Sequence, residues 1–208
     1  MIATGKNTFY SHYHKNTAQL KDGDLVQFDY APDYKYYSSD VTRVFPANGR
    51  FTPRQRELYT IYLRLYQALM TSIAVHVAPR DVVRTAVTKM DAVMASFQFT
   101  DPKIKEAAAR FFEGHRSRQN VASLGHFVGM EVHDVGRPAP TLEPGTIFTI
   151  EPAMQIPDEH LGIRLEDMIL ITPTGYENLS ASVPVEIDAI EKLMKEPGLS
   201  DAALKRRP

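Results

Sequence analysis

The chain has 208 residues, 43% hydrophobic and 24% charged, so it can bury one sizeable core and is expected to form a single domain over residues 1–208. Its 24 basic and 25 acidic residues give a net charge of −1, which argues against nucleic acid as a partner because no basic field would attract it. The absence of cysteine excludes disulfides, thiol nucleophiles and cysteine-bound zinc, and the lack of a signal-peptide core or a long apolar run predicts a cytoplasmic protein without membrane contact.

The first third of the chain predicts a hairpin followed by a helix. Residues 24–30 alternate apolar and polar side chains after an Asp-Gly turn signal, and residues 36–45 form a second run rich in Tyr, Val and Thr. From Pro53 to Ile73, apolar residues recur at three- and four-residue spacing. Thr52 fits the N-cap of this amphipathic helix because Pro53 follows it in the first turn.

The remaining two thirds predict further helices and then strands. Pro79 breaks the first helix, and a second apolar stripe runs from Val82 to Phe97. A short third helix is expected within residues 101–120. Turn signals then separate three expected strands, at residues 125–135, 146–156 and 163–172. A helix is expected over residues 187–193, and a frayed end over residues 196–208. Strands, then helices, then strands again indicate the α+β class.

Four acidic residues lie within apolar strand segments, where burying a carboxylate without a partner costs several kcal/mol. They are Asp29, Asp40, Glu151 and Glu166. Any one of them alone is explained by a solvated strand face or an ion pair. Four such residues near a histidine instead suggest that their carboxylates converge on a cation.

Two histidines, His126 and His133, lie in a glycine-containing segment and are seven residues apart. In an extended strand this odd separation directs the two side chains to opposite faces. Both can reach one site only if the chain bends or bulges near Gly129. The spacing alone therefore does not make both histidines ligands.

Five segments together carry a family resemblance: Asp22–Asp29, Ser39–Pro46, His126–Asp134, Thr149–Pro152 and Gly162–Asp167. In this order they resemble the pita-bread metallopeptidases, the family of aminopeptidase P, prolidase, methionine aminopeptidase and creatinase. The resemblance extends from about Ile2 to Leu199. It implies the pita-bread fold, in which helices cover a curved, mostly antiparallel sheet.

The resemblance further implies a centre of two divalent metal ions. Its five ligands would be Asp29, Asp40, His126, Glu151 and Glu166, with Asp40 and Glu166 bridging the ions. Oxygen-rich ligation with one imidazole and no thiolate suits Mn²⁺, Co²⁺ or Zn²⁺, and Mn²⁺ is the first expectation. Four carboxylates would carry about −4 of charge against +4 from the two ions, so the pocket would be nearly neutral.

The implied reaction is hydrolysis of a peptide bond by a metal-bridging hydroxide, with Glu151 as both ligand and general base. His12 would hydrogen-bond near the scissile peptide, and His133 would steady the carbonyl or the tetrahedral intermediate. Arg164 would pair with a ligand carboxylate or orient the site, unless it makes an ordinary strand ion pair. His14 is expected to be structural.

Two departures from the family pattern concern activity and assembly. Members that cleave Xaa-Pro bonds commonly carry a histidine four residues before the ligand histidine, where this chain has Ala122. Family catalytic domains also usually begin with a pair of helices before the segment that matches Ile2–Tyr10. The chain is therefore expected to be short at its N-terminus, to leave part of one sheet face uncovered and to form a homo-oligomer through that face.

The leading function is that of an Xaa-Pro aminopeptidase acting on proline-containing peptides, because residues 29–46 and 126–133 look closer to aminopeptidase P and prolidase than to methionine aminopeptidase. An Xaa-Pro dipeptidase is the first alternative, since the choice depends on how the far end of the pocket is closed. A non-catalytic peptide-binding member of the same fold is the second, because of Ala122 and the missing helices. Creatinase-type chemistry is a third option, with nothing specific in its favour.

Overall fold

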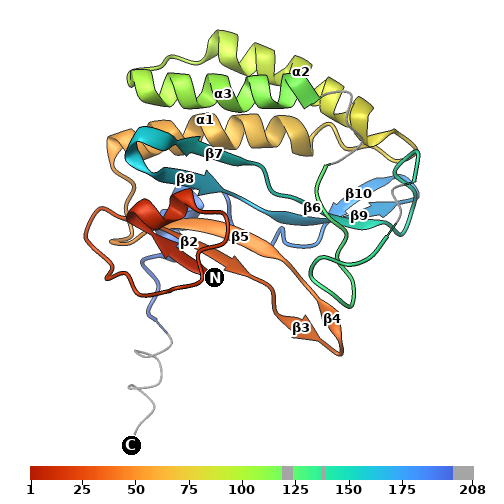
Figure 1. The fold of residues 1–208 in the computed structure, drawn as a ribbon, viewed down its shortest axis with the longest axis horizontal. Helices are drawn as coiled ribbons and strands as arrows, with labels where there is room; N and C mark the ends of the chain where they lie inside the picture. Colours follow the sequence, from red (N-terminus) through yellow and green to blue (C-terminus); the bar gives the residue numbers. More distant parts are fainter. Residues whose placement is uncertain (119–123, 137–138, 199–208) are drawn as a thin grey trace, which may run out of the picture.

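A computed structural model describes residues 1–118, 124–136 and 139–198 (Figure 1). The elements are β1 (Ile2–Thr4), η1 (Gly5–Phe9), β2 (Leu25–Tyr30), β3 (Asp33–Tyr34), β4 (Tyr37–Ser38), β5 (Val41–Pro46), α1 (Pro53–Met70), α2 (Pro79–Ser96), α3 (Pro102–Arg118), β6 (Ile147–Ile150), β7 (Ala153–Ile156), η2 (Pro157–Glu159), β8 (Leu161–Arg164), β9 (Asp167–Thr172), β10 (Gly175–Asn178) and α4 (Ile187–Leu193). Antiparallel strands and a separate helical layer confirm the α+β class. Within the described residues, no helix is long and apolar enough to cross a membrane.

The N-terminal hairpin is confirmed, with a second small hairpin at its end. Strands β2 and β5 pair antiparallel with Asp29 opposite Thr42, and β1 adds a third strand beside β2. The expected second strand starts at Val41 rather than at residue 36, because Lys35 and Tyr36 form the turn between β3 and β4. Both have positive φ, at 51° and 71°, as a two-residue type I′ turn requires.

Helices α1, α2 and α3 form one layer, at the top of Figure 1. Helix α1 begins as expected, because the Thr52 side chain accepts a hydrogen bond from the Gln55 amide and the Gln55 side-chain oxygen accepts one from the Thr52 amide. The third helix is longer than expected. Its buried residues recur at three- and four-residue spacing through the charged segment and extend it to Arg118: Ile104, Ala107, Ala108 and Phe111.

Each of the two long strands expected in the C-terminal half is interrupted once. The first divides into β6 and β7 at Glu151 and Pro152, and the second into β8 and β9 at Leu165 and Glu166. Strand β6 pairs with β9, and β7 pairs with β8. The register of the two ladders is the same, so Glu151 lies opposite Glu166 across the interruption.

The prediction of a strand over residues 125–135 is wrong, because this segment is a loop that makes only isolated β-bridges. The loop folds around the Asp134 side chain, which accepts a hydrogen bond from the Met130 amide. A Cβ atom at Gly129 would lie 2.0 Å from an oxygen of Asp134, so any larger residue there would displace this carboxylate from its place in the loop. Helix α4 is confirmed, whereas Ala122 and residues 199–208 of the expected frayed end lie outside the described residues.

One bridge joins the N-terminal ribbon to the C-terminal strands. The Glu166 amide donates to the Thr42 carbonyl at 3.0 Å, which makes an antiparallel bridge between the two residues. Arg43 and Asp167 form a buried ion pair beside it at 2.6 Å. The bridge therefore places β5 beside the interruption between β8 and β9.

Candidate metal centre

The five expected ligands lie together in one cavity of about 300 Å³. They fall into two groups whose ligand atoms lie within 4.8 Å of one another, and Glu166 belongs to both. The first group is Asp29, Asp40 and Glu166, and the second is His126, Glu151 and Glu166. A third group joins Asp40 to His126 and His133.

Strand register places the first group on one face. Asp29 lies opposite Thr42 in the β2–β5 ladder, and Glu166 is bridged to Thr42 from the other side. Residues opposite each other in a sheet project to the same face, as do residues two apart on one strand. Asp40, two residues before Thr42, therefore projects to the same side as Asp29 and Glu166.

The second group forms where β6 meets the 124–136 loop. Glu151 occupies the interruption opposite Glu166, two residues after Thr149. The Thr149 amide donates to the His126 carbonyl at 2.9 Å, and the His126 amide donates to the Thr149 hydroxyl at 3.3 Å. These bonds hold His126 beside the strand that leads to Glu151.

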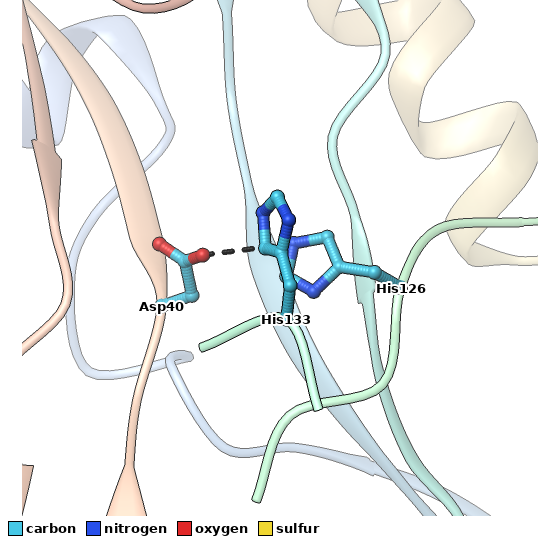
Figure 2. A group of neighbouring side chains, drawn as sticks. All are labelled: Asp40, His126 and His133. Atoms are coloured by element: carbon cyan, nitrogen blue, oxygen red, sulfur yellow. Dashed lines mark ion pairs between the residues drawn. The ribbon is translucent and has the colours of Figure 1, made fainter. Parts of the chain in front are cut away.

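His126 directs one ring nitrogen at the carboxylates. Its Nε2 lies 3.1 Å from an oxygen of Glu151, 3.6 Å from Asp40 and 3.8 Å from Glu166. Figure 2 shows Asp40 pointing from the start of β5 toward the ring, with the ion pair dashed. The other ring nitrogen, Nδ1, lies 3.1 Å from the Phe127 carbonyl and is placed to donate its proton there. With Nδ1 held by this bond, Nε2 is the nitrogen that can bind a cation in place of its proton.

Buried polar atoms without hydrogen-bond partners concentrate at this point. Among the described residues, such side-chain atoms include Asp40 Oδ1, His126 Nε2 and Glu166 Oε1. Leaving a buried acceptor unsatisfied is costly, and these atoms belong to neighbouring residues in one cavity. Carboxylate oxygens with one imidazole nitrogen are a donor set that fits divalent cations.

Burial disturbs the protonation of the carboxylates. Burial and the nearby charge of Asp29 raise the pKa of Asp40 above its usual range. Burial, together with the charges of Glu151 and Asp40, raises the pKa of Glu166 to about 8. Without a cation, protons bound to Asp40 and Glu166 would reduce the repulsion between the carboxylates. A bound cation would reduce the same repulsion in their place.

His126 and Glu151 shift in the directions of an ion pair. Burial lowers the pKa of His126, but its contacts with Glu151, Phe127 and Glu166 outweigh burial and bring it to about 9. Burial raises the pKa of Glu151, yet His126 and Arg164 hold it below its usual value. The negative field of the cluster thus already selects for positive charge.

The structure also brings the other expected site residues to the cavity. Arg164 donates to the Asp29 carboxylate and lies 3.7 Å from Glu151, so it pairs with two expected ligands. The rings of His126 and His133 lie 4.0 Å apart, because the loop bends near Gly129 as their spacing requires. The His12 ring lies 6.4 Å from His133, and His14 also lines the cavity.

Two contacts at the site are not predicted by the sequence. The Thr42 hydroxyl donates to Glu166 at 2.7 Å, and the Asp40 amide lies 3.0 Å from the sulfur of Met168. Thr42 could have been found, because a polar residue two positions after Asp40 shares its strand face. Met168 gives no such signal, since its position beside Asp40 depends on the Thr42–Glu166 bridge.

Known proteins match most of the chain. The model of metallopeptidase family M24 matches residues 1–173. The Xaa-Pro aminopeptidase of Escherichia coli (strain K12) is 37% identical over 93% of this chain and 46% of its own length. Two solved structures each match 93% of this chain. Proline aminopeptidase P II from Yersinia pestis is 35% identical, with a TM-score of 0.73 over 47% of its own chain. Zinc-substituted E. coli aminopeptidase P in complex with product is 34% identical, with a TM-score of 0.71 over 46% of its own chain. The chain spans about half the length of the curated relatives it matches.

Proposed function

Because this chain belongs to metallopeptidase family M24, we propose that it hydrolyses Xaa-Pro peptide bonds with the help of two divalent metal ions. Its fold is the α+β pita-bread fold of this family. The observation that best supports the proposal is the convergence of four carboxylates and His126 in one cavity, with Glu166 common to both ligand groups. The names of the relatives support the Xaa-Pro specificity.

Each ion is assigned its own ligands. Asp29 would bind one ion, and His126 and Glu151 the other, while Asp40 and Glu166 would bridge them. Mn²⁺ is the proposed metal because oxygen donors outnumber nitrogen donors, and Co²⁺ and Zn²⁺ are the alternatives. When bound, such ions polarise the substrate carbonyl and acidify water.

The remaining chemistry belongs to side chains of this chain. Glu151 would accept a proton from the attacking water as general base. His133 and His12 would donate hydrogen bonds to the substrate around the scissile carbonyl, where charge develops. Arg164 would keep the Asp29 carboxylate in place through its ion pair.

Activity on two substrates tests the proposal. The chain, reconstituted with Mn²⁺, Co²⁺ or Zn²⁺, would be assayed on a Gly-Pro dipeptide and on a longer Xaa-Pro-Xaa peptide. Cleavage of the longer peptide supports the aminopeptidase, and cleavage of the dipeptide alone supports the dipeptidase. A protein that retains only trace metal and cleaves neither would overturn the enzymatic proposal in favour of a non-catalytic peptide-binding protein.

We also propose that the chain forms a homo-oligomer and acts in the cytoplasm. Exposed aromatic side chains on the β3–β4 hairpin, Tyr34, Tyr36 and Tyr37, support the first proposal. Light scattering at increasing protein concentration tests it, and a constant monomer mass would contradict it. The lack of cysteine supports the cytoplasmic location, which fluorescent tagging in cells would test.

A further inference from the structure

Tyr62 of α1 hydrogen-bonds to both strand interruptions beneath the candidate metal centre. Its hydroxyl donates to the Pro152 carbonyl at 2.7 Å and accepts from the Leu165 amide at 2.7 Å. Pro152 directly follows Glu151, and Leu165 directly precedes Glu166. Through one hydroxyl, Tyr62 therefore connects the backbones beside two proposed metal ligands.

Tyr66, one helical turn later, bonds to the other side of each interruption. Its hydroxyl lies 3.3 Å from the Ile150 carbonyl and 2.7 Å from the Asp167 carboxylate. Ile150 precedes Glu151, and Asp167 follows Glu166. Residues four apart on a helix lie on the same face, so the two hydroxyls approach both interruptions side by side.

These bonds replace sheet pairing that is lost at the interruptions. Pro152 has no amide hydrogen, so it cannot complete a ladder pair with Leu165. The Tyr62 hydroxyl instead accepts a hydrogen bond from the Leu165 amide and donates one to the Pro152 carbonyl, which satisfies both backbone groups. It thereby fixes how far apart the two backbones lie where Glu151 and Glu166 project.

We propose that Tyr62 and Tyr66 form a tyrosine clamp that positions Glu151 and Glu166, and that the Tyr62 hydroxyl sets the separation of their carboxylates and hence the affinity for the metal pair. The clamp rests on the proposed metal-dependent function. Neither tyrosine touches the ions, because both act from the helical layer through the backbone next to each ligand. Tyr62 is fully buried, so no water competes for its hydroxyl.

A matched pair of variants tests the clamp. Tyr62→Phe keeps the ring and removes only the hydroxyl. Tyr59→Phe does the same to a tyrosine of α1 that is equally buried but donates to Val185, away from both interruptions. By calorimetric titration with Mn²⁺, we expect Tyr62→Phe to weaken metal binding about 10-fold or more and Tyr59→Phe to change it less than about 2-fold.

Two further measurements separate positioning from a general loss of stability. The electron paramagnetic resonance spectrum of the Mn²⁺ pair should change in Tyr62→Phe and match the wild type in Tyr59→Phe. In the metal-free protein, hydrogen exchange of the Leu165 amide should be slow in the wild type and at least about 10-fold faster in Tyr62→Phe than in Tyr59→Phe. If Tyr62→Phe does not fold, Tyr66→Phe takes its place in the titration and should weaken binding at least about 5-fold.

The outcomes distinguish this proposal from the function it rests on. Equal metal affinities for Tyr62→Phe and Tyr59→Phe, in a wild-type protein that binds two ions, overturn the clamp and leave the metallopeptidase proposal standing. The same holds if Tyr66→Phe, used as the replacement, binds metal as Tyr59→Phe does. A wild-type protein that binds no Mn²⁺ overturns both proposals.

Discussion

Glu166 is buried at the meeting point of two ligand groups, and its carboxylate accepts a hydrogen bond from Thr42 through one oxygen while the other has no hydrogen-bond partner. This arrangement suits a bridging ligand. Replacing it should affect both ions together, whereas replacing a residue that touches only substrate should not.

We therefore expect Glu166→Ala to lose both metal ions and to lower Xaa-Pro hydrolysis at least about 100-fold. His133→Ala should retain the metal while turnover falls about 100-fold, because its proposed role is to stabilise the carbonyl. Metal per chain by mass spectrometry and a peptide assay check both, with the exposed Glu177→Ala as control. Unchanged activity in Glu166→Ala would refute the ligand assignment.

The shifted pKa values predict how the metal-free protein responds to pH. The pKa of Glu166 is about 8 instead of 4.5, and the pKa of His126 is about 9 instead of 6.5. Both groups therefore bind protons more tightly in the folded state than in the unfolded state. The His126 contribution is fully present below pH 6.5 and is lost by about pH 9, and ionising Glu166 costs stability from pH 4.5 upward. The free energy of unfolding should therefore fall as pH rises through this window.

Urea unfolding at pH 5, 7 and 9 in the presence of a chelator checks this fall. Glu166→Gln cannot ionise at this position, so its stability should fall less between pH 5 and 9. Saturating Mn²⁺ should abolish the fall, because metal replaces the protons. A metal-free protein that is equally stable at pH 5 and pH 9 would contradict the prediction.

Among the elements, β5 and β9 are joined by the Arg43–Asp167 ion pair. Both side chains are only 3% exposed, and the Asp167 carboxylate also accepts from Tyr66 and Ser180. Removing one partner from such a pair leaves an uncompensated buried charge.

Asp167→Asn should lower the free energy of unfolding by about 3 kcal/mol or more, as measured by urea denaturation. Asp81→Asn is the matched control, because it removes the same charge from an exposed ion pair with Arg84. The control should change stability by less than about 0.5 kcal/mol. If the free energy of unfolding fell equally in the two variants, the buried Arg43–Asp167 pair would stabilise the protein no more than the exposed pair does.

The elements also show where prediction from sequence succeeds. Helix α1 was predictable because its capping signal and apolar spacing are local, and the four strand carboxylates were recognisable from their cost in an apolar run. The interruption at Pro152 has a signal in the sequence, because proline has no amide hydrogen, but the one at Leu165 and Glu166 has none, because it depends on which strand lies opposite Pro152 in the folded protein. The 125–135 loop was mistaken for a strand because the Asp134 side chain, rather than a neighbouring strand, satisfies the Met130 amide.

At the scale of the molecule, the candidate ligands come from both ends of the described chain. Asp29 and Asp40 belong to the N-terminal ribbon, whereas Glu151 and Glu166 belong to strands that follow the helical layer. A cation held by both sets links the ribbon to the C-terminal strands. Because the unfolded chain does not assemble this cluster, metal binding should stabilise the fold.

Mn²⁺ at 100 times its dissociation constant should raise the free energy of unfolding by about 2.7 kcal/mol for each site filled. Urea denaturation with and without the metal measures the gain, and Glu166→Ala should show none. Hydrogen exchange should also slow at the Glu166 amide, which donates across the bridge to Thr42. Stabilisation of Glu166→Ala equal to that of the wild type would place the metal elsewhere.

The Thr42–Glu166 bridge has a consequence for how the protein is made. It joins residues 124 positions apart, and the two ligand groups share the residue at its far end. During synthesis the hairpin with Asp29 and Asp40 leaves the ribosome long before Glu166 is translated. The complete ligand set therefore exists only after residue 166 has been made, so capture of both ions has to follow synthesis of the C-terminal strands.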